Sequence, residues 1–188
     1  MGQIKAIITD FDGTLVDTFI ANFNAYLETF KHFGYKLTKE QYRKCYGLRF
    51  DGFCDEMNIK EEDRKPMKEY KKEVYPKYFK YIELNNALLY FIRYMKAIGI
   101  KTCIASTASK ENLYNVIEFF KIKNNFDLIL TGEDVKFGKP DPYVYNEALI
   151  RLNIDSDEAL VFEDSNVGCE SANKAGINYI KITNGNSL

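Results

Sequence analysis

The sequence predicts an α/β fold, a doubly wound parallel sheet with a small helical module inserted after the first strand. Two observations predict it. Short, continuous apolar runs that end in polar or acidic residues alternate with amphipathic helical patterns, which is typical of a parallel sheet covered on both faces. One charged and aromatic-rich stretch, at about residues 19–84, interrupts this alternation with helical patterns alone.

The predicted strands are apolar runs without polar alternation. Four of them lie at residues 5–9, 101–105, 127–130 and 159–162, and residues 179–182 predict a fifth. The predicted helices between them end at helix-capping residues: residues 87–98 stop at Gly99, Ser109 can cap a helix that reaches Phe120, and residues 167–175 stop at Gly176. Because strand and helix alternate, ligands are expected outside the carboxyl ends of the strands.

The interrupting stretch, residues 19–84, predicts a separate helical module. Five residues mark helix boundaries within it: a capped start at Thr38 and Gln41, a loop at Gly47, and breaks at Pro66 and Pro76. No repeat, low-complexity tract or Pro/Ser linker sets this stretch apart. We therefore predict an insertion tethered by two short hinges, with residues 1–18 and 85–188 forming a Rossmann-like core.

Composition excludes several classes of partner. With 26 Lys and Arg against 27 Asp and Glu, the net charge is −1, so no strong field attracts nucleic acid or an anionic membrane. The absence of a membrane-length apolar run and of a charged leader predicts a cytoplasmic protein. Four scattered cysteines lack the paired spacing of a zinc site and predict reduced structural thiols: Cys45, Cys54, Cys103 and Cys169.

Acidic residues collect at the end of the first predicted strand. Asp10 and Asp12 flank Phe11 in "IITDFDGTLVDT", so in a regular strand both carboxylates point to one face and repel each other. Such a pair is tolerated where a cation lies between the carboxylates or where one of them carries a proton. Gly13 and Thr14 follow at once, and a glycine there allows close backbone approach.

Further polar residues follow the other predicted strands. Ser106 lies in "CIASTAS", Lys139 in "KFGKPDPYVY", and Glu163 and Asp164 in "LVFEDSNVG". Each alone has an ordinary structural explanation as a turn former, a helix cap or a solvated lysine. Parallel strands bring all of them to one edge of the sheet, where they suit phosphoryl transfer. A carboxylate can attack phosphorus, Mg²⁺ prefers carboxylate oxygens, and a lysine can stabilise the transferring group.

Four segments together, "DFDGTLVDT", "IAST", "GKPDPYVY" and "VFEDSNVG", resemble the ordered motifs of the haloacid dehalogenase superfamily of phosphotransferases. The insertion after the first motif is similar to the helical cap of one subgroup, which contains phosphoglycolate phosphatases, sugar phosphatases and β-phosphoglucomutases. The resemblance therefore implies that residues 1–18 and 85–188 are the catalytic core and residues 19–84 the cap.

The resemblance also implies a role for each motif residue. Asp10 would be the nucleophile and Asp12 the general acid and base. The phosphoryl group would be bound by Ser106, Thr107, Lys139 and Gly13, with Thr14 and Asp17 in support. Mg²⁺ would be held by Asp10, the backbone carbonyl of Asp12 and Asp164, with Glu163 either binding the ion or positioning a group that does.

The expected function is Mg²⁺-dependent hydrolysis of small phosphomonoesters, such as a sugar phosphate or phosphoglycolate, through an aspartyl phosphate. Asp12 argues against a haloalkanoic acid dehalogenase, whose first motif lacks it. A β-phosphoglucomutase is the alternative, but that subgroup usually carries a histidine where this chain has Asn22. In the cap, Arg49 of "YGLRFDGF" can meet a second anionic group of the substrate, although an exposed arginine is as ordinary there.

Two other classes use similar residues. An aspartate-phosphorylated signalling receiver also has an acidic Mg²⁺ site, but its acceptor follows the third strand, whereas Asp127 begins that run here. A catalytically inactive binding module is the other, yet no catalytic position of the motifs is lost. The expected partner is a small phosphorylated molecule, without nucleic acid or membrane, and the expected state is a monomer or weak homodimer.

Overall fold

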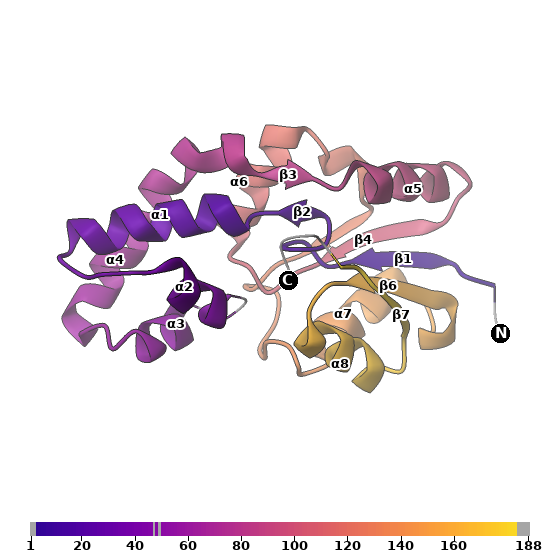
Figure 1. Cartoon of the computed structure of the whole chain (residues 1–188). Helices are drawn as coiled ribbons and strands as arrows, with labels where there is room; N and C mark the ends of the chain where they lie inside the picture. The colour runs from indigo at the N-terminus through magenta and orange to yellow at the C-terminus, as the bar shows by residue number, and fades with distance from the viewer. Residues whose placement is uncertain (1–2, 47, 49, 184–188) are drawn as a thin grey trace. The chain divides into compact units, whose positions relative to one another are not determined.

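The computed structural model of the chain describes residues 3–46, 48 and 50–183 (Figure 1). The chain divides into two compact units. We call them the α/β unit, formed by Met1–Asp17 with Leu84–Leu188, and the helical unit, formed by Thr18–Glu83. Since the chain leaves the α/β unit and later returns to it, the helical unit is an insertion in the sequence of the α/β unit.

A five-stranded sheet in the order β5-β4-β1-β6-β7 forms the centre of the α/β unit. Its strands are β1 (Ala6–Thr9), β4 (Lys101–Ala105), β5 (Leu128–Leu130), β6 (Ala159–Glu163) and β7 (Asn178–Lys181). All neighbouring strands are parallel. The predicted α/β class and its strands are confirmed, including the fifth. β5 begins after Asp127, whose carboxylate accepts a hydrogen bond from the Thr102 backbone N–H at 2.9 Å.

Helices cover both faces of this sheet (Figure 1). On one side lie α5 (Asn86–Ala97) and α6 (Lys110–Phe120), and on the other α7 (Tyr143–Leu152) and α8 (Asn166–Lys174). Ala6 and Ile8 of β1 pack in one buried cluster with residues of α7 and α8, while Ile7 between them points to the opposite face. Burial on both faces explains why the strands are continuous apolar runs.

Helix ends agree with the sequence except at α6. Gly99 and Gly176 follow α5 and α8 with φ of +89° and +72°, the left-handed conformation that glycine adopts without strain. Ser109 occupies the N-cap position of α6, but its side chain makes no capping hydrogen bond. The prediction that Ser109 caps this helix is therefore wrong. A carboxylate from another loop instead accepts from the N–H of Lys110, the first residue of α6, as described below.

The helical unit is built around aromatic side chains. Its elements are α1 (Phe19–His32), α2 (Lys39–Cys45), α3 (Phe50–Glu56), α4 (Glu61–Val74) and the 3₁₀ helix η1 (Tyr75–Tyr81). Phe19, Phe30, Tyr42 and Phe53 are among its buried core residues. The short strands β2 (Val16–Asp17) and β3 (Glu83–Leu84) pair separately and lie where the chain passes between units. The remaining 3₁₀ helices, η2 (Lys123–Asn125) and η3 (Ser156–Glu158), belong to the α/β unit.

The predicted helix boundaries of this unit are partly right. Thr38 and Gln41 form a reciprocal capping box, with hydrogen bonds of 3.2 and 2.8 Å. Pro66 lies inside α4 and does not break it, because one missing N–H and a local clash are outweighed by the rest of the helix and its buried face. Pro76 is the second residue of the 3₁₀ helix that follows α4. Gly47 lies outside the described residues.

The four cysteines are free and buried, as expected of structural thiols. Among the residues that the structure describes, no helix is long and apolar enough to cross a membrane.

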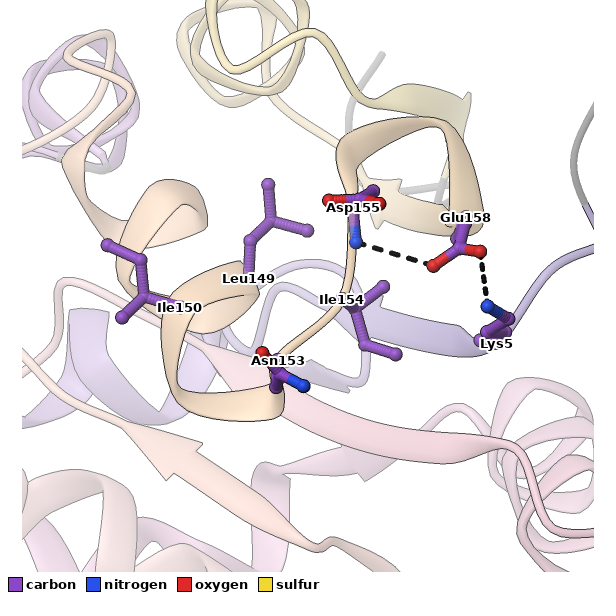
Figure 2. A pocket seen from close by; sticks show the side chains of 7 residues that line it. All are labelled: Lys5, Leu149, Ile150, Asn153, Ile154, Asp155 and Glu158. Carbon is purple, nitrogen blue, oxygen red and sulfur yellow. Dashed lines mark hydrogen bonds and ion pairs between the residues drawn. The ribbon is translucent and has the colours of Figure 1, made fainter.

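A surface pocket of about 510 Å³ lies near the start of β1, at the amino ends of the strands (Figure 2). The polar side chains around it include Lys5 and Glu158, which form an ion pair. This pocket is at the opposite edge of the sheet from the acidic residues of the motifs.

Candidate active site

The carboxyl ends of neighbouring strands bring the motif residues together. Asp10 directly follows β1, Ser106 follows β4, and Glu163 is the last residue of β6. Strand pairing places them there: the Asp10 N–H donates to the carbonyl of Phe162 at 2.9 Å, and the Ser106 N–H donates to the carbonyl of Leu130 at 3.1 Å. The expected convergence at one edge follows from the parallel register.

Three carboxylates and one lysine form the centre of the site. Oxygen atoms of Asp10, Glu163 and Asp164 all lie within 4.8 Å of one another. The Lys139 ammonium donates to Asp10 Oδ1 at 2.5 Å and to Glu163 Oε1 at 2.5 Å. The exposed fractions of the Lys139, Asp10 and Glu163 side chains are 7%, 10% and 1%. With all groups ionised the cluster carries −3 + 1 = −2, a charge held largely out of water.

The Glu163 carboxylate is held by several donors. Besides Lys139, Oε1 accepts from the Tyr145 hydroxyl at 3.0 Å, and Oε2 accepts from the N–H and the hydroxyl of Ser165, each at 3.0 Å. A carboxylate offers about four acceptor sites, so these donors use its capacity. A Cβ on Gly168 would lie 1.8 Å from Oε1, which explains why the first turn of α8 has a glycine near this group. Glu163 is thereby a fixed anchor for the Lys139 ammonium.

The segment after β1 wraps closely around Asp164. Gly13 has a φ of +93°, and a Cβ built there would lie 2.2 Å from Asp164 Oδ2. The Thr14 hydroxyl donates to Asp164 Oδ1 at 3.0 Å. Both the backbone conformation and the lack of space require glycine, and the threonine orients the carboxylate. Asp12 is half-buried beside them, with a backbone bridge to Val16.

The other predicted site residues lie in different places. Ser106 is buried, and its hydroxyl accepts from the Ala108 N–H at 3.0 Å, while Thr107 beside it is half-buried. Asn22 is on α1 in the helical unit, where its side-chain oxygen accepts from Lys71 Nζ at 2.8 Å. Arg49 lies outside the described residues.

Burial and mutual repulsion shift the titration of the acids. Burial raises the pKa of Asp10 well above its usual value, and the charges of Glu163 and Asp164 add to this against the attraction of Lys139. Burial and the charge of Glu163 raise the pKa of Asp164 to about 6. Burial also acts to raise the pKa of Glu163, but Lys139 and the hydrogen bonds from Ser165 outweigh it and the pKa is lowered.

The ammonium at the centre stays charged. Burial acts to lower the pKa of Lys139, but the charges of Asp10, Tyr145 and Glu163 oppose it and the pKa is raised well above its usual value. Lys139 is thus a permanent cation at neutral pH, whereas the raised pKa values of Asp10 and Asp164 mean that their ionised forms are disfavoured until a further cation offsets their charge.

Sequence reasoning missed several side chains, in each of the two units. Tyr145 and Ser165 complete the shell of Glu163, and neither spacing nor residue type in "YVY" or "EDSN" indicates this. Lys71 is buried in the helical unit, with its ammonium 4.0 Å from the Tyr75 ring centroid and 5.1 Å from that of Tyr26. Lys72 and Glu73, which follow it, are also charged, so only the folded helix distinguishes it.

The model of the family described as "Haloacid dehalogenase-like hydrolase" matches residues 7–182. This chain belongs to that family. The hydrolase is 31% identical over 184 residues to the phosphorylated carbohydrates phosphatase of Thermotoga maritima, covering 94% of this chain and 84% of the relative. The family predicted from the four motifs is therefore confirmed.

Solved structures resemble this haloacid dehalogenase-like hydrolase over nearly its whole length. The CbbY protein of Rhodobacter sphaeroides, crystallised in complex with phosphate, is 26% identical with a TM-score of 0.87, covering 97% of this chain and 87% of the relative. A putative β-phosphoglucomutase from Thermotoga maritima is 27% identical with a TM-score of 0.75, covering 98% and 90%.

Family membership separates the hydrolase from signalling receivers. Asp127, which precedes β5, lies at the amino end of that strand with its carboxylate bonded to Lys96 at 2.8 Å, far from where a receiver needs its phosphate acceptor. At the carboxyl end of β5 stands Thr131 instead.

Proposed function

We propose that this haloacid dehalogenase-like hydrolase is a Mg²⁺-dependent phosphatase of small phosphomonoesters, which acts through an aspartyl phosphate on Asp10. A sugar phosphate or a phosphoglycolate-like acid is the expected substrate, in line with the relative named for phosphorylated carbohydrates. The observation that carries the proposal is the Lys139 ammonium, 2.5 Å from Asp10 Oδ1, at an edge where three carboxylates meet.

In the first step, a carboxylate oxygen of Asp10 attacks phosphorus and the bond from phosphorus to the leaving oxygen breaks. Asp12 gives its proton to that oxygen, so a neutral alcohol leaves. The Lys139 ammonium, the Ser106 hydroxyl, and backbone N–H groups at Thr107 and Gly13 bind the phosphoryl oxygens and stabilise their charge as it develops.

In the second step, water attacks the phosphorus of the aspartyl phosphate. Asp12, now ionised, takes a proton from that water, and the bond from phosphorus to Asp10 breaks. Inorganic phosphate leaves, Asp10 is again a carboxylate, and Asp12 is again protonated, so the cycle closes.

The residues of this site fit Mg²⁺. Asp10, Asp164 and the backbone carbonyl of Asp12 would hold the ion, with Glu163 close by, and the excess of two negative charges equals the charge of one divalent cation. Bound there, Mg²⁺ supplies positive charge that favours ionised Asp10 and offsets repulsion between the nucleophile and the phosphoryl oxygens. Because its acceptor sites are used by protein donors, we assign Glu163 chiefly to positioning Lys139.

We assign specificity to the helical unit, through Asn22 and Arg49. Asn22 stands where mutases of the subgroup usually carry a histidine, and an amide bonded to Lys71 has no proton to exchange near neutral pH. Water rather than a sugar hydroxyl is therefore the proposed final acceptor. Arg49 is the proposed contact for a second anionic group of the substrate.

Phosphate release from a panel of phosphorylated sugars, phosphoglycolate, nucleotides and pyrophosphate tests the activity, with Mg²⁺ and with excess chelator. We expect release from small phosphomonoesters that stops in chelator, and undiminished release in chelator contradicts the metal assignment. Incubation with β-glucose 1-phosphate and glucose 1,6-bisphosphate tests the mutase alternative. Glucose 6-phosphate accumulating without phosphate release would mean that the Asn22 argument is wrong.

A further inference from the structure

Two loops at the active edge of the sheet are bonded to each other. We call residues 106–109, which follow β4, the β4 loop, and residues 131–134, which follow β5, the β5 loop. The Ser106 N–H donates to the Leu130 carbonyl at 3.1 Å, and the Gly132 N–H donates to the Ala108 carbonyl at 2.7 Å. The β5 loop thus continues the strand pairing beyond the sheet and supports the β4 loop along its length.

Gly132 allows this close approach. A Cβ built on Gly132 would lie 2.6 Å from the Thr107 carbonyl oxygen and 3.0 Å from that of Ala108. Both contacts are with backbone atoms, which cannot rotate away as a flexible side chain can. Any larger residue at this position must therefore push the β4 loop away from the β5 loop.

Glu133 of the β5 loop contacts the start of α6, directly after the β4 loop. Ser109 occupies the N-cap of α6, yet its buried hydroxyl oxygen has no hydrogen-bond partner among the described residues. The N–H of Lys110, the first residue of α6, donates to the Glu133 carboxylate at 2.7 Å. A carboxylate here satisfies an N–H group that the helix leaves open, and its charge is favourable at the positive end of the helix.

The β5 loop is held by hydrogen bonds of its own. The Asp134 carboxylate accepts from the Thr131 N–H at 3.0 Å and from its hydroxyl at 2.8 Å, and its other oxygen accepts from Arg151 of α7 at 3.2 Å. These bonds outweigh the effect of burial and lower the pKa of Asp134. A loop tied in this way to α7 can hold a neighbouring loop in place.

We propose that Gly132 and Glu133 are positioning residues, which fix Ser106 and Thr107 of the β4 loop in the geometry that binds the phosphoryl group. The inference rests on the proposed function, since it takes the β4 loop as a phosphate-binding element. Displacement of such groups by about 1 Å can cost about 100-fold in rate. Neither residue touches the substrate in this role, and both act through the β4 loop.

The test compares Glu133→Ala and Glu133→Gln with the parent enzyme, using p-nitrophenyl phosphate as substrate and inorganic phosphate as competitive inhibitor. Glu118→Ala is the matched control, because it removes one exposed carboxylate from α6 itself. We expect Glu133→Ala to raise KM and the inhibition constant of phosphate about fivefold, the loss of roughly one capping bond. Glu133→Gln, which keeps an acceptor, should recover most of this, and Glu118→Ala should change neither constant.

Gly132→Ala gives the larger displacement, and we expect kcat/KM to fall about 100-fold. All assays are run well below the thermal midpoint of each variant. Unchanged phosphate inhibition in Glu133→Ala overturns the inference, as does a fall in kcat with phosphate inhibition unaltered.

Ser106→Ala distinguishes the positioning role of Gly132 and Glu133 from phosphate binding by the β4 loop. If it weakens phosphate inhibition while Glu133→Ala and Gly132→Ala do not, the positioning role is wrong and the phosphatase site stands. If Ser106→Ala leaves phosphate inhibition unchanged, the proposed phosphate-binding role of the β4 loop is itself wrong.

Discussion

A glutamate paired with a lysine lies at each end of β6, Glu158 directly before the strand and Glu163 as its last residue, but the two pairs differ in environment. At the amino end, Glu158 pairs with Lys5 beside the surface pocket, with side chains 19% and 55% exposed (Figure 2). At the carboxyl end, Glu163 pairs with Lys139, with side chains 1% and 7% exposed. The same two residue types thus form a screened surface contact at one edge and a buried ion pair at the other.

The difference in burial means that only the Glu163–Lys139 pair costs desolvation free energy to form. Around Lys5, water and salt screen the charges, and the hydrogen bond between the partners raises the pKa of Lys5 and lowers that of Glu158. Around Lys139, two carboxylates and an ammonium have been taken out of water. Removing one of these groups leaves the remaining charges buried without compensation. A buried cluster of this kind is a poor way to gain stability, so its presence favours a chemical role.

Asp10→Asn should have the largest effect on the carboxyl-end centre. The amide keeps its shape and its acceptor for Lys139 but lacks the attacking oxyanion, so we expect phosphate release to fall at least about 10⁴-fold with the fold intact. Circular dichroism checks the fold and mass spectrometry locates the phosphorylated residue in the parent enzyme. Asp155→Asn at the amino edge is the control. A phosphorylated residue other than Asp10 would contradict the mechanism.

Lys139→Met should lower both the stability of the fold and the rate of phosphate release. It leaves Asp10 and Glu163 buried without their cation, which we expect to lower the free energy of unfolding by about 3–5 kcal/mol in chelator. Urea unfolding measures the change, and activity should be lost with it. If the variant is as stable as the parent and still releases phosphate, the buried ammonium is not the centre of this site.

Thermal stability in chelator should depend on pH through Asp164. Its pKa is about 6 in the folded chain against an ordinary value of 3.8, so between these values the folded state binds more protons than the unfolded state. Stability from this group is therefore present at low pH and is lost as pH rises from about 4 to 6, with a fall in Tm on the order of a few degrees.

Two further measurements check that the fall in Tm with rising pH comes from Asp164. Asp164→Asn should flatten the pH dependence of Tm, because the amide does not titrate. Saturating Mg²⁺ should reverse it, because a bound cation favours the ionised carboxylates. A slope that survives Asp164→Asn belongs to another group.

Lys5→Met should have the smallest effect. The pair with Glu158 is exposed at the lysine, so we expect no measurable change in Tm or in phosphate release. Scanning calorimetry beside Lys139→Met makes the comparison direct. A loss of activity in Lys5→Met would mean that the pocket at the amino edge is coupled to the candidate active site. The contrast between the two ion pairs predicts no such coupling.

Many residues at the carboxyl ends of the strands could be predicted from the sequence, because strand periodicity and the order of the elements along the chain determine their positions. Asp10, Ser106 and Asp164 each follow an apolar run, and parallel pairing brings the ends of such runs together whatever the side chains between them. The capping box at Thr38 and Gln41 was predictable for a similar reason, since its partners are three residues apart. The roles of these residues in catalysis stay predictions until the experiments above are done.

Contacts that depend on packing could not be read from the chain. Ser109 has the residue type and position of a helix cap, yet its side chain makes no capping hydrogen bond. The carboxylate at the start of α6 comes from Glu133 of the β5 loop, which accepts from the Lys110 N–H. Pro66 has the signature of a helix break, but α4 continues through it. Local preferences are worth about 1–3 kcal/mol, and long-range contacts can exceed them.

The sequence by itself therefore determined the class of fold, the insertion and the acids that follow the strands, because these depend on periodicity and order along the chain. Only the tertiary structure decided that Tyr145 and Ser165 complete the shell of Glu163, and that Lys139 is buried between two carboxylates while Lys5 stays in water. Two Lys–Glu pairs look alike in sequence. Their electrostatics differ because burial is a property of the packed structure and not of the residue type.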